Sequence, residues 1–340
     1  MKTLLKLSLI TTLGLGQLAY AQHSTHPAGQ KIQAIMGTQD AIDATPRCDV
    51  DLMGGDAGGS LAAINMVPCL LNLQAGVTGP TGAAGVTKTL TFDGYSFKAH
   101  IVVLDTPVTV DGKTYDYEAK IWTCDTNCNA TTDFFPAIWM AFSANATKSV
   151  NKGVLVNNFD ADTGNFIGAS FIRWDTGSAT TTRNIESVQG ECRSDGSFDS
   201  RFMKYTREVS TGITKYAMRE GDNTAEAYTL LIELNTKTNI GSVNENGSGA
   251  DPFERKAATL VFDGANRSDY TYTATGTYTP SFLTLPTFNA NSFTAVACTG
   301  GAISAGNTNG TITELGKGVG LLASPLAQPM NGMTLNPSNI

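Results

Sequence analysis

Strict alternation of side-chain types over Thr114–Trp122 constrains the fold of this chain more than any other stretch. With a period of two, one face of the segment carries Tyr115, Tyr117, Ala119 and Ile121, and the other carries Asp116, Glu118, Lys120 and Trp122. Because successive side chains of a strand point to opposite faces, the pattern predicts a half-buried β-strand. We expect the aromatic face to be the inner one, since the opposite register would bury three charges without partners.

Asp111-Gly112 stands between this segment and the apolar run that ends at Val108–Val110. Asp-Gly between two strand patterns favours a tight hairpin, because a type I′ turn requires positive φ at both central residues. The sequence therefore predicts that Val108–Val110 and Thr114–Trp122 form a hairpin. In that arrangement Trp122 lies on the charged face, where it either covers polar side chains or packs against a separate layer near Cys124.

Strand patterns recur along most of the chain from residue 87 onward. Further candidates are Lys98–Val110, Phe134–Phe142, Val150–Phe159, Asn165–Trp174, Arg183–Cys192, Phe198–Val209, Ile213–Arg219, Glu226–Leu234, Ala257–Phe262, Asp269–Tyr278 and Asn291–Cys298. Pro136 indicates an edge strand or an irregular start. Strands at this spacing predict a mainly β fold, either a large antiparallel sandwich or a curled or open β-barrel, of about 10–12 strands.

The segments on either side of the predicted β domain differ from it in composition. Apolar residues recur at helical spacing over Gln30–Ile42 and Leu61–Leu73, which predicts two short helices with a Gly-rich loop between them. After Cys298 the chain lacks aromatic residues and is rich in Gly, Asn, Thr and Ala. We therefore expect a helical and loop segment over 22–86, an all-β domain over 87–298 and a loosely ordered tail over 299–340.

The first 21 residues have the pattern of a secretory signal peptide. Lys2 and Lys6 precede a short apolar run, and Ala19-Tyr20-Ala21 has the small-x-small form of a cleavage site. The run is too short to span a bilayer, which needs about 20 apolar residues. We expect an exported bacterial protein that is periplasmic, associated with the outer membrane or secreted, and without a transmembrane helix once cleaved.

Charge and cysteine content agree with export. Removing two of the 23 basic residues with the signal peptide leaves 21 against 30 acidic residues, a net charge near −9. Such a surface repels phosphate backbones, so nucleic acid is not an expected partner. An even number of cysteines in an exported chain indicates disulfides. Six cysteines can pair in 15 ways. Short loops favour Cys48–Cys69 and Cys124–Cys128, and Cys192 and Cys298 then remain to pair with each other.

Residues for catalysis are sparse, and no catalytic residue is assigned. His100 is the only histidine of the predicted fold, and it lies among apolar strand residues. Asp160 and Asp162, followed by Gly164, partly resemble a calcium loop, but the positions after them depart from the EF-hand pattern. A hairpin turn explains the same residues, so no cofactor is expected beyond this possible calcium ion. Carboxylates in an acidic chain also leave a glycosidase open.

Aromatic residues interleaved with polar ones suggest a binding surface. Tyr115, Tyr117, Trp122, Tyr270 and Tyr272 suit stacking on a sugar or lining an apolar pocket, although aromatic residues also favour strands for packing alone. Three hypotheses follow. The first is a non-catalytic envelope or surface protein with a structural, adhesive or partner-binding role. The second is a periplasmic carrier with a lipid or other apolar ligand inside a curled sheet. The third is a hydrolase of envelope polysaccharide.

Overall fold

The fold is described from a computed structural model, and almost all of the described chain is β-strand. The residues described are 76–77, 79–92, 95–125, 127–144, 150–159, 168–175, 182–192, 198–222, 226–235, 237–238, 240–247, 254–262, 270–273, 280–284, 298–299, 302–303, 333 and 335. The two short helices expected over Gln30–Ile42 and Leu61–Leu73 lie outside these residues. The described helix is a single 3-10 turn over Thr131–Asp133, in which the Asp133 carboxylate accepts from the backbone N–H of Ala130 at 2.8 Å.

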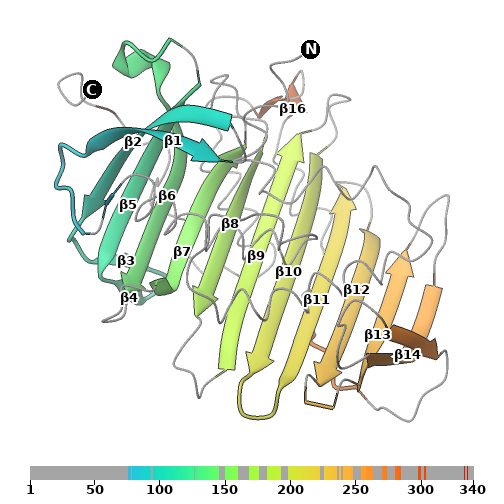
Figure 1. The fold of residues 1–340 in the computed structure, drawn as a ribbon. Coiled ribbons are helices and arrows are strands. Elements are labelled where there is room, and N and C mark those ends of the chain that lie inside the picture. The colour runs from blue at the N-terminus through green and yellow to red at the C-terminus, as the bar shows by residue number, and fades with distance from the viewer. Residues whose placement is uncertain are drawn as a thin grey trace.

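One antiparallel sheet of 13 strands forms the body of the molecule (Figure 1). Its strand order is β1-β2-β5-β6-β7-β8-β9-β10-β11-β12-β13-β14-β15, so each strand pairs with the next one of the sheet along the chain. The bounds are β1 Val86–Phe92, β2 Tyr95–Leu104, β5 Tyr117–Cys124, β6 Phe135–Ala144, β7 Val150–Phe159, β8 Gly168–Asp175, β9 Thr182–Cys192, β10 Phe198–Glu208, β11 Ile213–Asp222, β12 Glu226–Asn235, β13 Ile240–Gly247, β14 Glu254–Phe262 and β15 Tyr270–Thr273.

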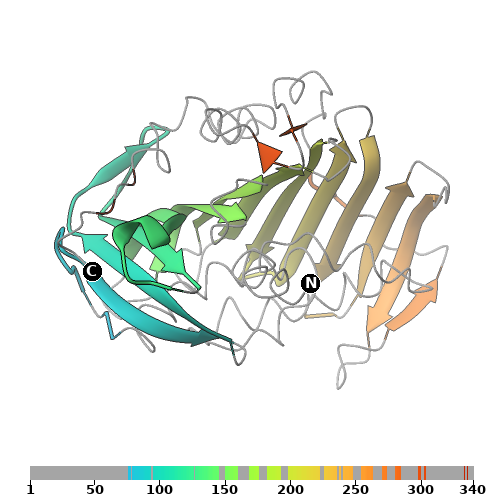
Figure 2. The same cartoon turned by 90° about the horizontal axis from the view of Figure 1, so that it is seen from above.

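The sheet is open, because β1 and β15 stand at its two edges and pair with different neighbours. Seen from above, it twists along its length and the β1–β5 end turns away from the plane of the later strands (Figure 2). The expected mainly antiparallel β fold is confirmed, and the sheet is a single open one. The physical reason is the unbroken pairing of neighbours, in which no strand of the series leaves to build a second large sheet.

The hairpin predicted at Asp111-Gly112 is present, but it is separate from the main sheet. Among the residues that the structure describes, β3 (Val108–Val110) pairs only with β4 (Lys113–Tyr115), in a two-stranded sheet. Asp111 and Gly112 have φ of 50° and 73°, both positive, as a type I′ turn requires. A second small sheet consists of β16 (Cys298–Thr299) and β17 (Ala302–Ile303).

A bend at Asp116 corrects part of the predicted strand. It divides Thr114–Trp122 into β4 and β5, and the two parts lie on different layers. Ala119 and Ile121 are buried on one face of β5, as expected. Tyr115 instead packs in the cluster that contains Trp122, on the opposite side of the main sheet. The two-residue period fails here because it holds only while the backbone stays extended.

Directly paired residues of neighbouring strands share a face, so the register defines the two faces of the sheet. Face B carries a transverse row of paired residues that continues over six strands from β7 to β12. In strand order, these are Gly153, Trp174, Ile185, Tyr205, Tyr216 and Ile232. All six are buried. Trp174 fills the space above Gly153, where an added Cβ would lie 2.5 Å from the indole.

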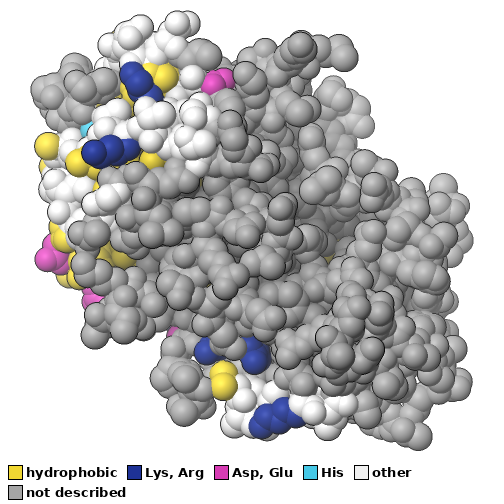
Figure 3. All heavy atoms as spheres, viewed as in Figure 1, with side chains coloured by type: hydrophobic (Ala, Val, Ile, Leu, Met, Phe, Trp, Pro, Cys, Tyr) yellow, Lys and Arg dark blue, Asp and Glu magenta, His cyan; other side chains and the backbone are white. Residues whose placement is uncertain are grey.

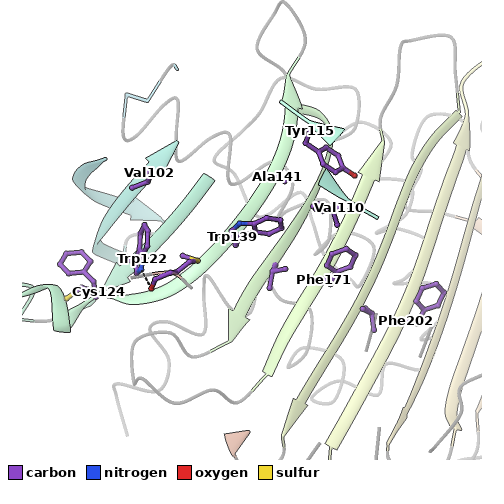
Figure 4. Close-up of a cluster of buried hydrophobic side chains, with 14 residues drawn as sticks. Val102, Val110, Tyr115, Trp122, Cys124, Trp139, Ala141, Phe171 and Phe202 are labelled. Carbon is purple, nitrogen blue, oxygen red and sulfur yellow. Dashed lines mark hydrogen bonds between the residues drawn. The ribbon is translucent and has the colours of Figure 1, made fainter. Parts of the chain in front are cut away.

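Face A carries an apolar cluster at the β2–β10 end of the sheet (Figure 4). The sheet contributes large side chains that include Trp122, Trp139, Phe171 and Phe202, and the β3–β4 hairpin packs Val110 and Tyr115 onto them. Met333, from far along the sequence, completes the cluster. Both faces of the sheet are therefore buried at this end, which explains why its strands carry apolar residues on both sides.

Candidate interaction surface

Trp122 is held on face A by contacts from two distant segments, β2 and the residues around Met333. His100 lies directly opposite it on β2, with ring centroids 5.8 Å apart and planes inclined by 58°. The Trp122 Nε1–H donates to the backbone oxygen of Met333 at 3.4 Å. His100 is fully buried, and its Nδ1 lies 2.7 Å from the Thr87 hydroxyl. Burial lowers the pKa of His100, so the ring favours its neutral form.

The charges expected to be exposed beside Trp122 are instead half-buried and paired. Glu118 Oε2 lies 3.0 Å from Lys120 Nζ, and its other carboxylate oxygen accepts from Trp139 Nε1 at 2.8 Å. All three side chains lie on face A by register. Because Glu118 has two hydrogen-bond or ion-pair donors, its partial burial leaves no polar group without a partner, and this face holds both tryptophans and charges.

Beyond the apolar cluster, face A becomes a polar strip across β8, β9 and β10. The name polar strip refers to Arg173, Glu186 and Lys204. Glu186 on β9 is paired directly with Arg173 on β8 and with Lys204 on β10. Lys204 Nζ and the Glu186 carboxylate are 2.7 Å apart, and their side chains are 33% and 25% exposed. Charges of alternating sign on paired positions stabilise a sheet modestly.

The Arg173 end of the polar strip is covered by another part of the chain, and a further covered ion pair lies on the neighbouring strands β11 and β12. At the Arg173 end Asp111 of the hairpin turn lies 2.7 Å from Arg173, and these side chains are only 9% and 16% exposed. On β11 and β12, Lys215 Nζ lies 3.2 Å from the Glu233 carboxylate. The Lys215 ammonium donates to the backbone oxygen of Ser281, and the backbone N–H of Ser281 donates to Glu233. Of these three ion pairs, Glu186–Lys204 is therefore the most exposed.

The chemistry available on the polar strip is recognition through hydrogen bonds rather than strong attraction of ions. Each described cation of the strip has an acidic partner, so the local charges largely cancel. On the face shown in Figure 3, the described lysine and arginine side chains lie in separate groups in the upper and lower parts of the view. Such a surface suits a polar partner with mixed charges, which is recognised by matching donors and acceptors.

The five aromatic residues proposed for ligand binding do not share one site. Tyr115 and Trp122 are buried within the apolar cluster of face A. Tyr117 is on the opposite face, where it stacks on Phe142 with ring centroids 5.4 Å apart. Tyr270 and Tyr272 belong to β15 at the far edge of the sheet. Burial raises the pKa of Tyr115, an effect opposed by the nearby Arg173 charge, so its phenol stays neutral.

The Cys124–Cys128 disulfide is present, with Cys124 buried in the apolar cluster. Asp160 and Asp162, the possible calcium ligands, lie outside the described residues, as do Cys48 and Cys69. Cys192 ends β9 and Cys298 begins β16, and their pairing stays a prediction. Within the described chain there is no group of three or more His, Cys, Asp or Glu residues suited to a metal ion.

Sequence reasoning missed the polar strip, although the three strands that carry it were predicted. Arg173, Glu186 and Lys204 lie in segments that were predicted as strands, and alternation assigns each a face of its own strand. Their mutual alignment depends on the register between strands, which alternation within one strand does not reveal.

No helix in the described part of the chain has the length and hydropathy to cross a bilayer. Comparison with known proteins gives no family for this chain: no family model, no curated protein and no solved structure matches it.

Proposed function

We propose that this chain is an exported protein of a bacterial envelope or surface with a non-catalytic structural, adhesive or partner-binding role. The observation that supports it best is how the apolar positions of the sheet are used. Those of face A are filled by the chain's own hairpin and by Met333, and the large side chains of face B are buried. A filled sheet suits a rigid scaffold, whereas a carrier keeps an apolar cavity for its ligand.

The polar strip is the part of this scaffold that we assign to partner contact. Glu186 and Lys204 stay partly exposed between two covered regions, and their rigid strands fix the positions of both charges. A partner with complementary donors and acceptors would bind there without any change in the fold. Envelope and surface components, including polysaccharides and other exported proteins, have this mixed polar chemistry.

Fractionation of native host cells tests the proposal. We expect the mature chain to begin at Gln22 and to co-sediment with envelope components. The double reversal Glu186→Lys/Lys204→Glu should release it, because the reversal keeps the internal ion pair but inverts the pattern seen by a partner. Lys237→Glu, at an exposed position outside the strip, is the matched control. A chain that retains Met1 in the cytoplasm would contradict export, and unchanged sedimentation of the reversal would contradict the assigned surface.

Lipid extraction of the natively purified protein, followed by mass spectrometry, separates the scaffold from the carrier. We expect no lipid in stoichiometric amount. One tightly bound apolar molecule per chain would overturn the scaffold and favour the carrier instead.

A further inference from the structure

The β3–β4 hairpin is connected through the backbone to the main sheet at its base, and it packs on the sheet through side chains. It is inserted between β2 and β5, which are themselves neighbours in the sheet, with Leu104 and Glu118 as their last pair before the insertion. The connections are residues 105–107 on one side and Asp116 on the other, and these residues are exposed. In the described chain, β3 and β4 pair as strands only with each other. Moving the hairpin therefore breaks no strand pairing of the 13-stranded sheet.

The two sides of the hairpin have opposite chemistry. Val110 and Tyr115 are buried against the apolar cluster, with Val108 packed partly on it. On the outer side, the hydroxyl groups of Thr109 and Thr114 lie 3.0 Å apart and are exposed. Beneath the inner side the sheet presents apolar residues of the same cluster, which include Ala141, Val154 and Phe171. The hairpin thus has the form of a cover over an apolar surface.

One ion pair holds the free end of this cover. Asp111, in the turn, accepts a hydrogen bond of 2.7 Å from Arg173 Nη2 on β8, three strands away from β5. The Arg173 guanidinium is itself positioned over the Phe171 ring, 5.8 Å from its centroid. A weaker contact lies near the base, where the Asp116 N–H donates to the Ser143 hydroxyl at 3.3 Å.

We propose that the β3–β4 hairpin is a hinged lid, latched by Asp111 and Arg173, which opens independently of the sheet and uncovers the apolar surface of Ala141, Val154 and Phe171. The hinge is at residues 105–107 and at Asp116. The latch joins the moving turn to an interior strand of the sheet, and this ion pair is present in the closed position and lost in an open one. Release of the latch shifts the population toward the open state without unfolding the sheet.

Hydrogen exchange measured by mass spectrometry on the full chain tests the lid. Arg173→Gln and Asp111→Asn remove the charge pair, and Asn tolerates the positive φ of position 111. We expect amides of residues 108–115 to exchange about tenfold faster in both variants, the size expected for losing a hydrogen bond between charged groups. Amides of β6, β7 and β9 should keep their wild-type rates. Lys204→Gln is the matched control, since it breaks an ion pair on the same face that does not touch the hairpin.

A dye that binds apolar surface provides a second measurement of lid opening. Anilinonaphthalene sulfonate should fluoresce more with the two latch variants than with wild type or Lys204→Gln. The lid is refuted if residues 108–115 exchange at wild-type rates in both latch variants. It is equally refuted if those residues and the strands β5–β8 accelerate together, because the hairpin would then open only with the sheet. If Arg173→Gln does not fold, Asp111→Asn at the turn decides between these outcomes.

Discussion

His100 shows how a single buried side chain makes the stability of the fold depend on pH. Its ring contacts Thr87 on β1 and Trp122 on β5, and neither neighbour is acidic. Lys98 lies on the same face of its own strand, two residues away. A proton on the ring would therefore be buried without a carboxylate to stabilise it, which is why burial lowers the pKa of His100 from 6.5.

We predict that the free energy of unfolding falls as the pH drops through 6.5, the value for an unperturbed histidine. The unfolded chain takes up a proton on His100 in that range, whereas the folded chain does so only at lower pH, so acid favours unfolding. Urea denaturation at pH 7.5 and pH 5.5 measures the change. His100→Gln removes this titration, and its loss of stability between the two pH values should be smaller. An equal loss in both proteins would show that His100 is not responsible.

Gly153 is a position where the lack of a side chain is required by close packing. An added Cβ would lie 2.5 Å from the Trp174 ring and 2.8 Å from the Ala141 backbone oxygen. Gly153→Ala should therefore cost about 1–3 kcal/mol, as overpacked substitutions in cores do. Gly79→Ala is the control, because an added Cβ there meets nothing within 4 Å. Thermal unfolding of the two variants should differ clearly, and similar melting temperatures would mean that Trp174 does not pack over this glycine.

At the scale of single elements, β5 carries different interactions on its two faces. Tyr117 stacks on Phe142 on face B, and Glu118 pairs with Lys120 and Trp139 on face A. Tyr117→Asp places a charge against that aromatic ring and should cost about 2–4 kcal/mol, within the range for large effects of single substitutions. Glu118→Gln retains an acceptor for the Trp139 indole and should cost about 1 kcal/mol. Equal melting temperatures of the two variants would contradict this assignment of faces.

Most individual strands could be predicted because their local pattern sets them. Val150–Phe159 was predicted with the bounds that β7 has. The turn predicted from the Asp111-Gly112 dipeptide is present, and both residues have the positive φ that such a turn requires. β13 was missed because Ile240–Gly247 contains mainly polar residues and glycine, and its strand form depends on pairing with β12 and β14. Pro136 marks an irregular position of β6, where the register with β5 shifts, but β6 is an interior strand rather than an edge.

The bend at Asp116 limited what could be inferred about the candidate site. Nothing in the alternation of Thr114–Trp122 signals it, because polar and apolar residues continue to alternate on both sides of the bend. The inner position of Tyr115 comes from the way the hairpin folds back onto face A, which is a tertiary effect. The polar strip was not predicted for the same reason, since it depends on how three strands align in the folded protein.

At the scale of the whole molecule, Met333 joins a late segment of the chain to β5, near the β1 end of the sheet. It is 6% exposed, and it lies 211 positions after Trp122, whose indole donates to its backbone oxygen. Met333→Ala should cost about 2–5 kcal/mol, as truncation of a buried methionine does. Leu335→Ala, at a partly buried neighbour, should cost less. Chemical denaturation measures both, and a negligible effect of Met333→Ala would show that this contact is not part of the core.

The order of the strands also sets the order in which the molecule is completed during synthesis. Every pairing of the main sheet joins segments that follow closely along the chain, so loop closure costs little at each step and the sheet can extend as new residues emerge. The Trp122–Met333 contact is different, since translation at 5–20 residues per second needs roughly 10–40 s to cross the intervening residues. Strands β6 to β15 are made during that interval, and Trp122 stays uncovered by Met333 until it ends, so a holding chaperone would find an apolar surface there.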